Sequence, residues 1–127
     1  MPSDKEYERL LAFRTRLREF DQWSRNAAAS HGLTHAQHQL LLAVRGHGDP
    51  AGPTIGDVAQ ALLVKNHTAS ELVGRAEALG LLSRIRDTAD QRRVRLQLTE
   101  QGQAVLQRLT AVHVEELRRL APLLEGI

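Results

Sequence analysis

The 127-residue sequence predicts a single domain that is mainly α-helical and carries one small β-hairpin. Two long segments, at residues 4–30 and 101–125, repeat apolar side chains at three- and four-residue steps, which is the spacing of an amphipathic helix. Residues 82–98 instead alternate apolar and polar side chains on either side of a polar turn, as the strands of a hairpin do. Aromatic residues make up only 3% of the chain, which favours a helical core of aliphatic side chains.

The composition argues against several classes of protein. The chain has no cysteine, so it can hold neither a disulfide nor a thiolate zinc site. It has no apolar run of about 18 residues, and its first residues lack the layout of a secretory signal, so we expect a cytoplasmic protein with no membrane partner. A phosphate-binding glycine loop, a nucleophile elbow and an H-E-x-x-H motif are missing, so we expect neither an enzyme nor a cofactor.

The first predicted helix is longer than a domain of this size needs to close its core. A helix over residues 4–30 spans about 40 Å, so part of its apolar stripe should pack against another chain. The alternative is a helix that lies wholly on its own domain. The stripe consists of Tyr7, Leu10, Phe13, Leu17, Phe20 and Trp23.

Two capping boxes mark the next two helices. Thr34 is followed three residues later by Gln37, which predicts a helix through Arg45. The segment at residues 46–53 contains three glycines and two prolines and predicts a loop. Thr54 and Asp57 repeat the capping pattern, and the Asp57 carboxylate suits the positive end of a short helix that continues to Leu62.

The helix that follows has an apolar back and a hydrogen-bonding front. Its buried stripe should contain Ala69, Leu72, Val73 and Ala76. Its solvated face should contain Asn66, His67, Ser70, Glu71 and Arg75. Because a short helix and a tight connection precede it, and Gly80 fits its end, the two helices match a helix-turn-helix whose second helix makes the contacts.

The predicted hairpin is strongly basic. Between Ser83 and Arg95, five arginines oppose two aspartates, a local charge of +3 in a chain whose total is +2. A polar helix face followed by a basic hairpin indicates DNA binding. The alternatives on charge alone are a solvated ribbon and a contact with an acidic protein, and only DNA binding should weaken by orders of magnitude from low to moderate salt.

Taken in order, these features resemble the MarR family of transcription regulators. The resemblance covers residues 30–105 closely and the terminal helices loosely. Its most specific part is the Asp-x-Arg, Leu-Thr and Gly series behind the helix-turn-helix. The matching motifs are Leu33-Thr34-x-x-Gln37, Asp57-Val58-Ala59, His67-Thr68-Ala69-Ser70-Glu71-Leu72-Val73-x-Arg75, Gly80-Leu81 and Asp90-x-Arg92-x-x-Arg95-x-x-Leu98-Thr99-x-x-Gly102.

The resemblance implies a prokaryotic, homodimeric winged helix-turn-helix regulator, expected to act as a repressor on a pseudo-palindromic operator in double-stranded DNA. Residues 34–99 would form the DNA-binding region, and the helices at 4–30 and 101–125 the dimer interface. By position, Arg92 would reach the minor groove, Asp90 would hold the wing turn and Leu98 would anchor the returning strand. The residues expected to contact DNA are Lys65, Asn66, His67, Thr68, Ser70, Arg75, Arg84, Arg86, Arg92, Arg93 and Arg95.

Three features depart from what the family or a stable helix would lead us to expect, and a fourth, Glu71, is an acidic residue on the face expected to contact DNA. Leu63 stands where a turn glycine is common. Gly74 should weaken its helix by about 1 kcal/mol relative to alanine. Glu71 would face DNA, so we expect its carboxylate to pair with Arg75 four residues later. Only 25 residues follow Gly102, so we expect the last helix to be short or merged with the preceding one.

The resemblance also implies control by a small molecule. Many family members release DNA when a phenolic or other amphipathic effector binds between the dimer helices and the winged domain. Phe20, Trp23 and His38 are the candidates to line such a pocket, with ordinary core packing as the alternative. A metal-responsive regulator that uses His31, His35 and His38 is a further alternative, but no nearby carboxylate or cysteine completes a four-ligand set, so we expect no metal site.

Overall fold

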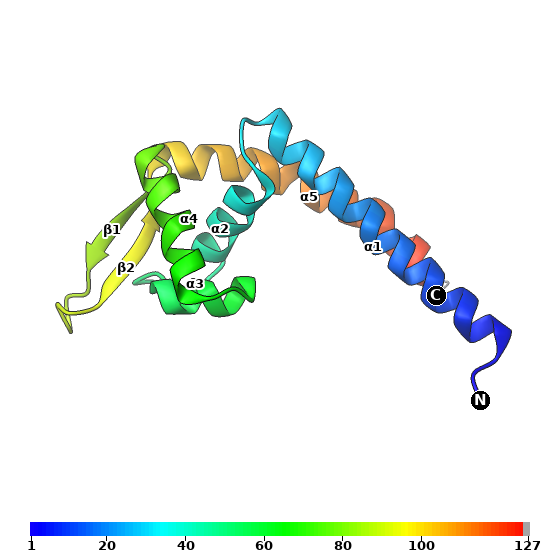
Figure 1. Cartoon of the computed structure of the whole chain (residues 1–127). Coiled ribbons are helices and arrows are strands. Elements are labelled where there is room, and N and C mark those ends of the chain that lie inside the picture. The colour runs from blue at the N-terminus through cyan, green and yellow to red at the C-terminus, as the bar shows by residue number, and fades with distance from the viewer. Residues whose placement is uncertain (126–127) are drawn as a thin grey trace.

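The computed structural model describes residues 1–125, which form five helices and one two-stranded antiparallel sheet. The elements are α1 Asp4–Ser30, α2 His35–Arg45, α3 Ile55–Leu62, α4 Asn66–Ala78, β1 Leu82–Arg86, β2 Val94–Leu98 and α5 Glu100–Glu125. The predicted mainly α class with a hairpin is confirmed. Figure 1 shows α1 and much of α5 running side by side as an arm that projects from the part built by α2, α3, α4 and the hairpin.

Side-chain caps start the first three helices. The Thr34 hydroxyl accepts from the Gln37 amide at 3.1 Å and the Gln37 side chain accepts from the Thr34 amide, as predicted. Thr54 and Asp57 form the same pair of bonds at the start of α3. A third box, between Ser3 and Glu6, caps α1 and was missed in the sequence. Each box satisfies amide groups that a helix start leaves without partners, so the helix starts are set locally.

α2 occupies the centre of the structure. It packs on α1 and α5 on the side of the arm and on α3, α4 and β2 on the other. Leu40 and Leu41 of α2 are fully buried, together with Val73 of α4, Leu96 of β2 and Leu109 of α5. One aliphatic core therefore joins the arm to the helix-turn-helix and the hairpin.

The strands lie in the predicted places. Leu82 pairs with Leu98 and Arg86 pairs with Val94. Leu98 is partly buried against the core, which agrees with its predicted anchoring role. α5 starts very close to the chain before β1, since a Cβ on Gly102 would lie 1.9 Å from the Leu81 carbonyl oxygen. This position therefore requires glycine.

The arm exposes a large apolar surface. Ser24 and Ala28 are the buried residues of α1, so the first two-thirds of its apolar stripe is left open to solvent. α5 is one continuous helix through Pro122, so the last helix is merged, as expected, and it is not short. None of the described helices is long and apolar enough to span a membrane. The exposed apolar residues of the arm include Tyr7, Leu10, Leu11, Phe13, Leu17, Val114, Leu117, Leu123 and Leu124.

The turn between α3 and α4 keeps a glycine-type geometry without a glycine. Leu63 has φ 57° and ψ 43°, in the left-handed region, and its amide bonds back to the end of α3. The next amide, of Val64, donates to the Ala59 carbonyl at 3.0 Å, which closes the turn. The Leu63 side chain is 90% exposed. Leucine therefore carries the steric cost of the left-handed conformation and gains little burial in return.

Leu63→Gly should raise the free energy of unfolding by about 1 kcal/mol, because glycine adopts the left-handed conformation without the Cβ clash. Urea titration at one fixed protein concentration measures the change. Leu79→Gly is the matched control, since Leu79 is 53% exposed at the end of α4 but has φ −82°, so there glycine should destabilise. Equal losses in both variants would contradict the argument.

Candidate nucleic-acid interface

The exposed face of α4 consists of hydrogen-bonding side chains. Ala69, Val73 and Ala76 are buried as predicted, which turns the opposite face of the helix outward. The outward residues are Asn66, His67, Ser70, Glu71 and Arg75, and Thr68 is half-buried beside them. Lys65 is the N-cap, and its side chain makes no capping bond. The first amides of α4 are thus free of a side-chain cap and suit an anion such as a phosphate.

The hairpin turn is built by two aspartates. Asp87 accepts from the Ala89 amide at 2.8 Å, and Asp90 accepts from the Arg92 amide at 3.0 Å. The Arg93 amide donates to the Asp90 carbonyl at 2.9 Å. The bond from Ala89, followed by the bond from Arg95, lowers the pKa of Asp87, so this carboxyl stays ionised. The predicted role of Asp90 in the wing turn fits these bonds, and Asp87 was missed.

The arginines of the hairpin differ in freedom. The side chain of Arg92 is 94% exposed at the turn and has only a loose contact, at 3.4 Å, with Asp90. Arg84 pairs with Glu77 of α4 at 3.1 Å, and Arg86 donates to the Gln91 carbonyl at 2.8 Å. Arg93 is exposed as well. These four arginine side chains therefore remain at the surface.

Arg95 is not one of these surface arginines, which corrects the prediction that it contacts DNA. Its side chain is only 12% exposed. Its Nε donates to Asp87 at 2.9 Å, and its Nη1 donates to the Gly52 carbonyl at 3.0 Å and lies 3.7 Å from Asp49. The bond to Asp87 raises the pKa of Arg95. The Nε and Nη1 donors of Arg95 therefore bond within the fold.

The expected ion pair between Glu71 and Arg75 is also wrong. Within residues 1–125 no contact of 4 Å or less joins their charged groups, and both side chains point to solvent. A pair of exposed long side chains gains little in water, so nothing holds them together. Glu71 remains a carboxylate on the outward face of α4.

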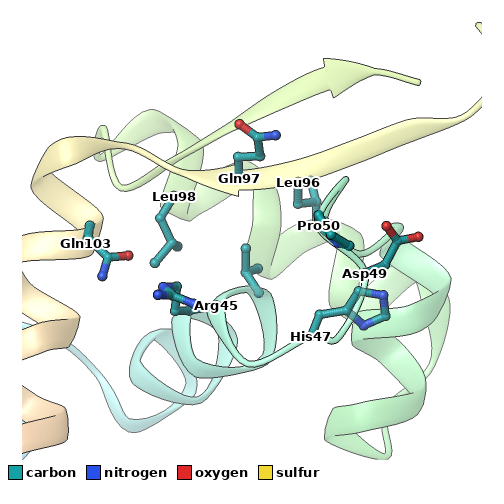
Figure 2. A pocket seen from close by; sticks show the side chains of 10 residues that line it. Arg45, His47, Asp49, Pro50, Leu96, Gln97, Leu98 and Gln103 are labelled. Atoms are coloured by element: carbon teal, nitrogen blue, oxygen red, sulfur yellow. The ribbon is translucent and has the colours of Figure 1, made fainter. Parts of the chain in front are cut away.

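A pocket of about 260 Å³ lies behind the base of the hairpin (Figure 2). The loop between α2 and α3 forms one side of it, and β2 and the start of α5 form the other. His47 in this loop lies 3.8 Å from Asp57. The residues that line this pocket and are labelled in Figure 2 are Arg45, His47, Asp49, Pro50, Leu96, Gln97, Leu98 and Gln103.

A second pocket, of about 280 Å³, lies where α1, α2 and α5 meet. Phe20 and His38, two of the three candidates for an effector pocket, line it, while Trp23 stacks on Phe20 at 6.1 Å without being part of the lining. The other residues that line this second pocket are Ser24, Gln39, Leu42, Thr110, His113, Val114 and Leu117. The sequence offered a signal for Ser24 and His113, because each is a polar residue at helical spacing within an apolar stripe.

Two histidines meet in this second pocket. His113 Nδ1 carries a proton, because it lies 2.7 Å from the Leu109 carbonyl oxygen, which can only accept, and Nε2 shares a hydrogen bond of 2.7 Å with the Ser24 hydroxyl. The His38 ring lies 4.6 Å from the His113 ring, and Trp23 packs edge-on at 4.8 Å. Burial, and then the electrostatic effect of the neighbouring His113, lower the pKa of His38 to about 4. His38 is therefore neutral at physiological pH.

The histidines at 31, 35 and 38 do not converge on one point. His31 Nδ1 donates to the Ala27 carbonyl at 2.9 Å, and His35 Nδ1 is buried without a partner. Among the described residues, no three histidine or carboxylate side chains are placed to hold a metal ion. The metal-responsive alternative therefore gains no support from the arrangement.

Comparison with known proteins gives consistent results. A sequence model described as "MarR family" matches residues 31–93. The HTH-type transcriptional regulator PecS of Dickeya dadantii is 31% identical over 90 residues, which are 71% of this chain and 54% of PecS. TtmR of Methylorubrum extorquens, also an HTH-type transcriptional regulator, is 30% identical over 68% of this chain and 43% of its own. The match thus spans about half the length of these relatives.

Solved structures are similar over most of the chain. MepR, a transcription regulator of the Staphylococcus aureus multidrug efflux pump MepA, has a TM-score of 0.75 and 26% identity over 87% of this chain and 79% of its own. The structure of an S. aureus MepR–DNA complex has the same TM-score, 25% identity, and covers 87% of this chain and 78% of MepR. The winged-helix fold is therefore the fold of these proteins as well.

Acid should destabilise this protein through His38. The unfolded chain binds a proton on this histidine below about pH 6.5, whereas the folded chain does so only near pH 4, so stability falls as the pH drops through that window. We expect a loss of about 2 kcal/mol in the free energy of unfolding between about pH 7.5 and about pH 5. Urea titrations at the two pH values measure it.

His38→Gln should remove most of this acid-dependent loss. His67→Gln is the matched control, because His67 is exposed at the start of α4 and its replacement should leave the pH dependence unchanged. The same acid-dependent loss in all three proteins would show that His38 does not cause it.

Proposed function

The chain belongs to the MarR family of winged-helix regulators, and we propose that it is a sequence-specific DNA-binding transcription regulator that acts as a homodimeric repressor on a pseudo-palindromic operator. One observation carries the proposal. The start of α4, with its exposed polar side chains, and the hairpin turn with Arg92 both lie toward the lower side of the molecule in Figure 1, away from α5. A duplex on that side could contact both.

The two elements suit different parts of the duplex. α4 would enter the major groove, where Asn66, His67 and Ser70 can bond to base edges. Lys65, Thr68 and Arg75 would bond to phosphates beside the groove. In the wing, Arg92 would reach the minor groove, whose potential is strongly negative where it narrows. Arg84, Arg86 and Arg93 would add attraction to the backbone.

The exposed arm supports the homodimer. Large apolar side chains on α1 and α5 are open to solvent in one copy of the chain, and contiguous exposed apolar surface of this kind is typical of protein contacts. A second copy would cover them and hold two α4 helices at one spacing. Two half-sites in the operator would follow from that symmetry. MepR, whose structure with DNA is solved, shares the fold over most of this chain.

The pocket between α1, α2 and α5 supports control by an amphipathic or phenolic effector. Its walls are mainly apolar, neutral His38 supplies a hydrogen-bonding group without charge, and the paired Ser24 and His113 side chains supply further polar atoms. It lies between the arm and the helix-turn-helix, where α2 contacts both. An effector that fits one relative position of these parts better than another would change the spacing of the two α4 helices and weaken DNA binding.

Selection of bound sequences from a random DNA pool tests the function directly. We expect a paired motif whose half-sites are about 10 bp apart from centre to centre, because each half-site takes one α4 helix. In ultracentrifugation the same preparation should sediment as a dimer of the 14.1 kDa chain. A pool without enriched sequences would contradict DNA recognition and favour the alternative of a protein partner.

Two substitutions should separate base contacts from backbone affinity. Asn66→Ala should lower affinity for the selected operator by about 5- to 100-fold with little change on random DNA, because it removes a base contact. Arg92→Ala should weaken binding to both and reduce the slope of log affinity against log salt by about one, because it removes one positive charge from the DNA. Fluorescence anisotropy over a salt series measures both.

The outcome that would contradict these assignments is specific. If Asn66→Ala lost the same factor on random DNA as on the operator, α4 would not discriminate between bases through this residue. If Arg92→Ala bound like the unchanged protein, the wing would have no part in binding.

A further inference from the structure

We propose that Arg95 is a positioning residue of the DNA interface, which locks the hairpin turn to the loop before α3 and so sets the position of Arg92 relative to α4. The inference rests on the proposed function. Arg95 itself would make no contact with DNA, because its side chain is only 12% exposed and its Nε and Nη1 bond to Asp87 and Gly52.

The first half of the lock is the bond to the hairpin turn. Asp87 stands at the end of β1, and its side chain is 11% exposed. One oxygen accepts from Arg95 Nε at 2.9 Å, and the other accepts from the amides of Ala89 at 2.8 Å and Asp90 at 3.4 Å. The Asp87 amide donates to the Arg93 carbonyl at 3.0 Å. Arg95 therefore binds the Asp87 carboxylate, which also holds the amides of the turn.

The second half of the lock is the bond to the loop between α2 and α3. Arg95 Nη1 donates to the Gly52 carbonyl at 3.0 Å, and the Leu96 amide donates to the Pro53 carbonyl at 2.9 Å. Gly52 has φ 89°, and a Cβ there would lie 2.3 Å from the Leu96 carbonyl oxygen, so the loop touches the strand directly. α3 begins two residues after Pro53 and packs on α4.

Arg95 therefore links the two parts of the proposed interface. A continuous series of contacts runs from the turn through Asp87, Arg95 and Gly52 to α3. α3 in turn packs on α4. Among residues 1–125, the other hydrogen bonds of residues 87–93 stay within the hairpin. A two-stranded ribbon twists easily. A planar guanidinium with two fixed bonds resists that twist better than a flexible ammonium would.

Arg95→Met is the test, because methionine keeps an unbranched apolar stem and removes the guanidinium and its bonds. We expect operator affinity to fall about 10- to 100-fold, the size of the loss of a wing contact, with an unchanged slope against salt. In a chain that already carries Arg92→Ala, the same substitution should lower operator affinity by less than about twofold. Displacing the turn then moves no Arg92 contact away from the DNA.

Control variants make the result specific. Asp87→Asn breaks the lock from the other side and should reproduce the loss, which also covers the case in which Arg95→Met does not fold. Arg95→Lys should recover only part of the affinity, since lysine cannot form both bonds. Arg45→Met removes an equal charge from the exposed end of α2, outside the proposed DNA and dimer contacts, and should leave operator affinity within about twofold.

Hydrogen exchange separates failure of this inference from failure of the proposed function. Without DNA, the amides of residues 87–93 should exchange faster in Arg95→Met than in the unchanged protein, while those of α4 should not change. If the unchanged protein binds no DNA but the amides of residues 87–93 exchange faster in Arg95→Met, the proposed function is wrong. The role of Arg95 in holding the hairpin turn is then still supported. A reduced salt slope, additive losses with Arg92→Ala, or unchanged affinity and exchange would each overturn the positioning role.

Discussion

The packing of α2 is the constraint on which the rest of the structure depends. Leu40 and Leu41 are completely buried, and they lie where the arm formed by α1 and α5 meets α3, α4 and β2. Since one short helix contacts both sides, any movement of the arm relative to α4 must repack this core. Close-packed cores have few alternative arrangements, so such a movement would be a switch between discrete states. The pocket lined by His38 lies at this same junction.

The hairpin shows how one residue type takes two roles. Arg92 extends from the turn into solvent, whereas Arg95 is enclosed by Asp87, Gly52 and Asp49. The difference is made by the loop between α2 and α3, which lies against β2 (Figure 2). The Gly52 carbonyl of this loop accepts from Arg95. A free guanidinium can still exchange water for phosphate, but a buried, paired one would first have to leave its partner. Affinity and geometry are thus assigned to different arginines.

Much of the fold could be predicted, and the reasons are local. The Thr34 and Thr54 caps, the apolar stripe of α4 and the alternation of the strands depend on residues within four positions of one another. The site was predicted less completely. Arg95 and the Glu71–Arg75 pair were wrong, and Asp87, Ser24 and His113 were missed. The DNA-contact roles of α4 and the wing, and the dimer role of the arm, remain proposals.

The sequence by itself determined the elements, their order and the family pattern, because caps, stripes and alternation are short-range properties of the chain. Only the tertiary structure decided which charges are free and which polar groups meet. Arg95 and Gly52 are 43 positions apart, and Ser24 and His113 are 89 apart. Such contacts carry no local signature, since burial and pairing arise only when distant segments pack. For that reason the sequence counted five hairpin arginines as equals, and the structure separates Arg95 from the other four.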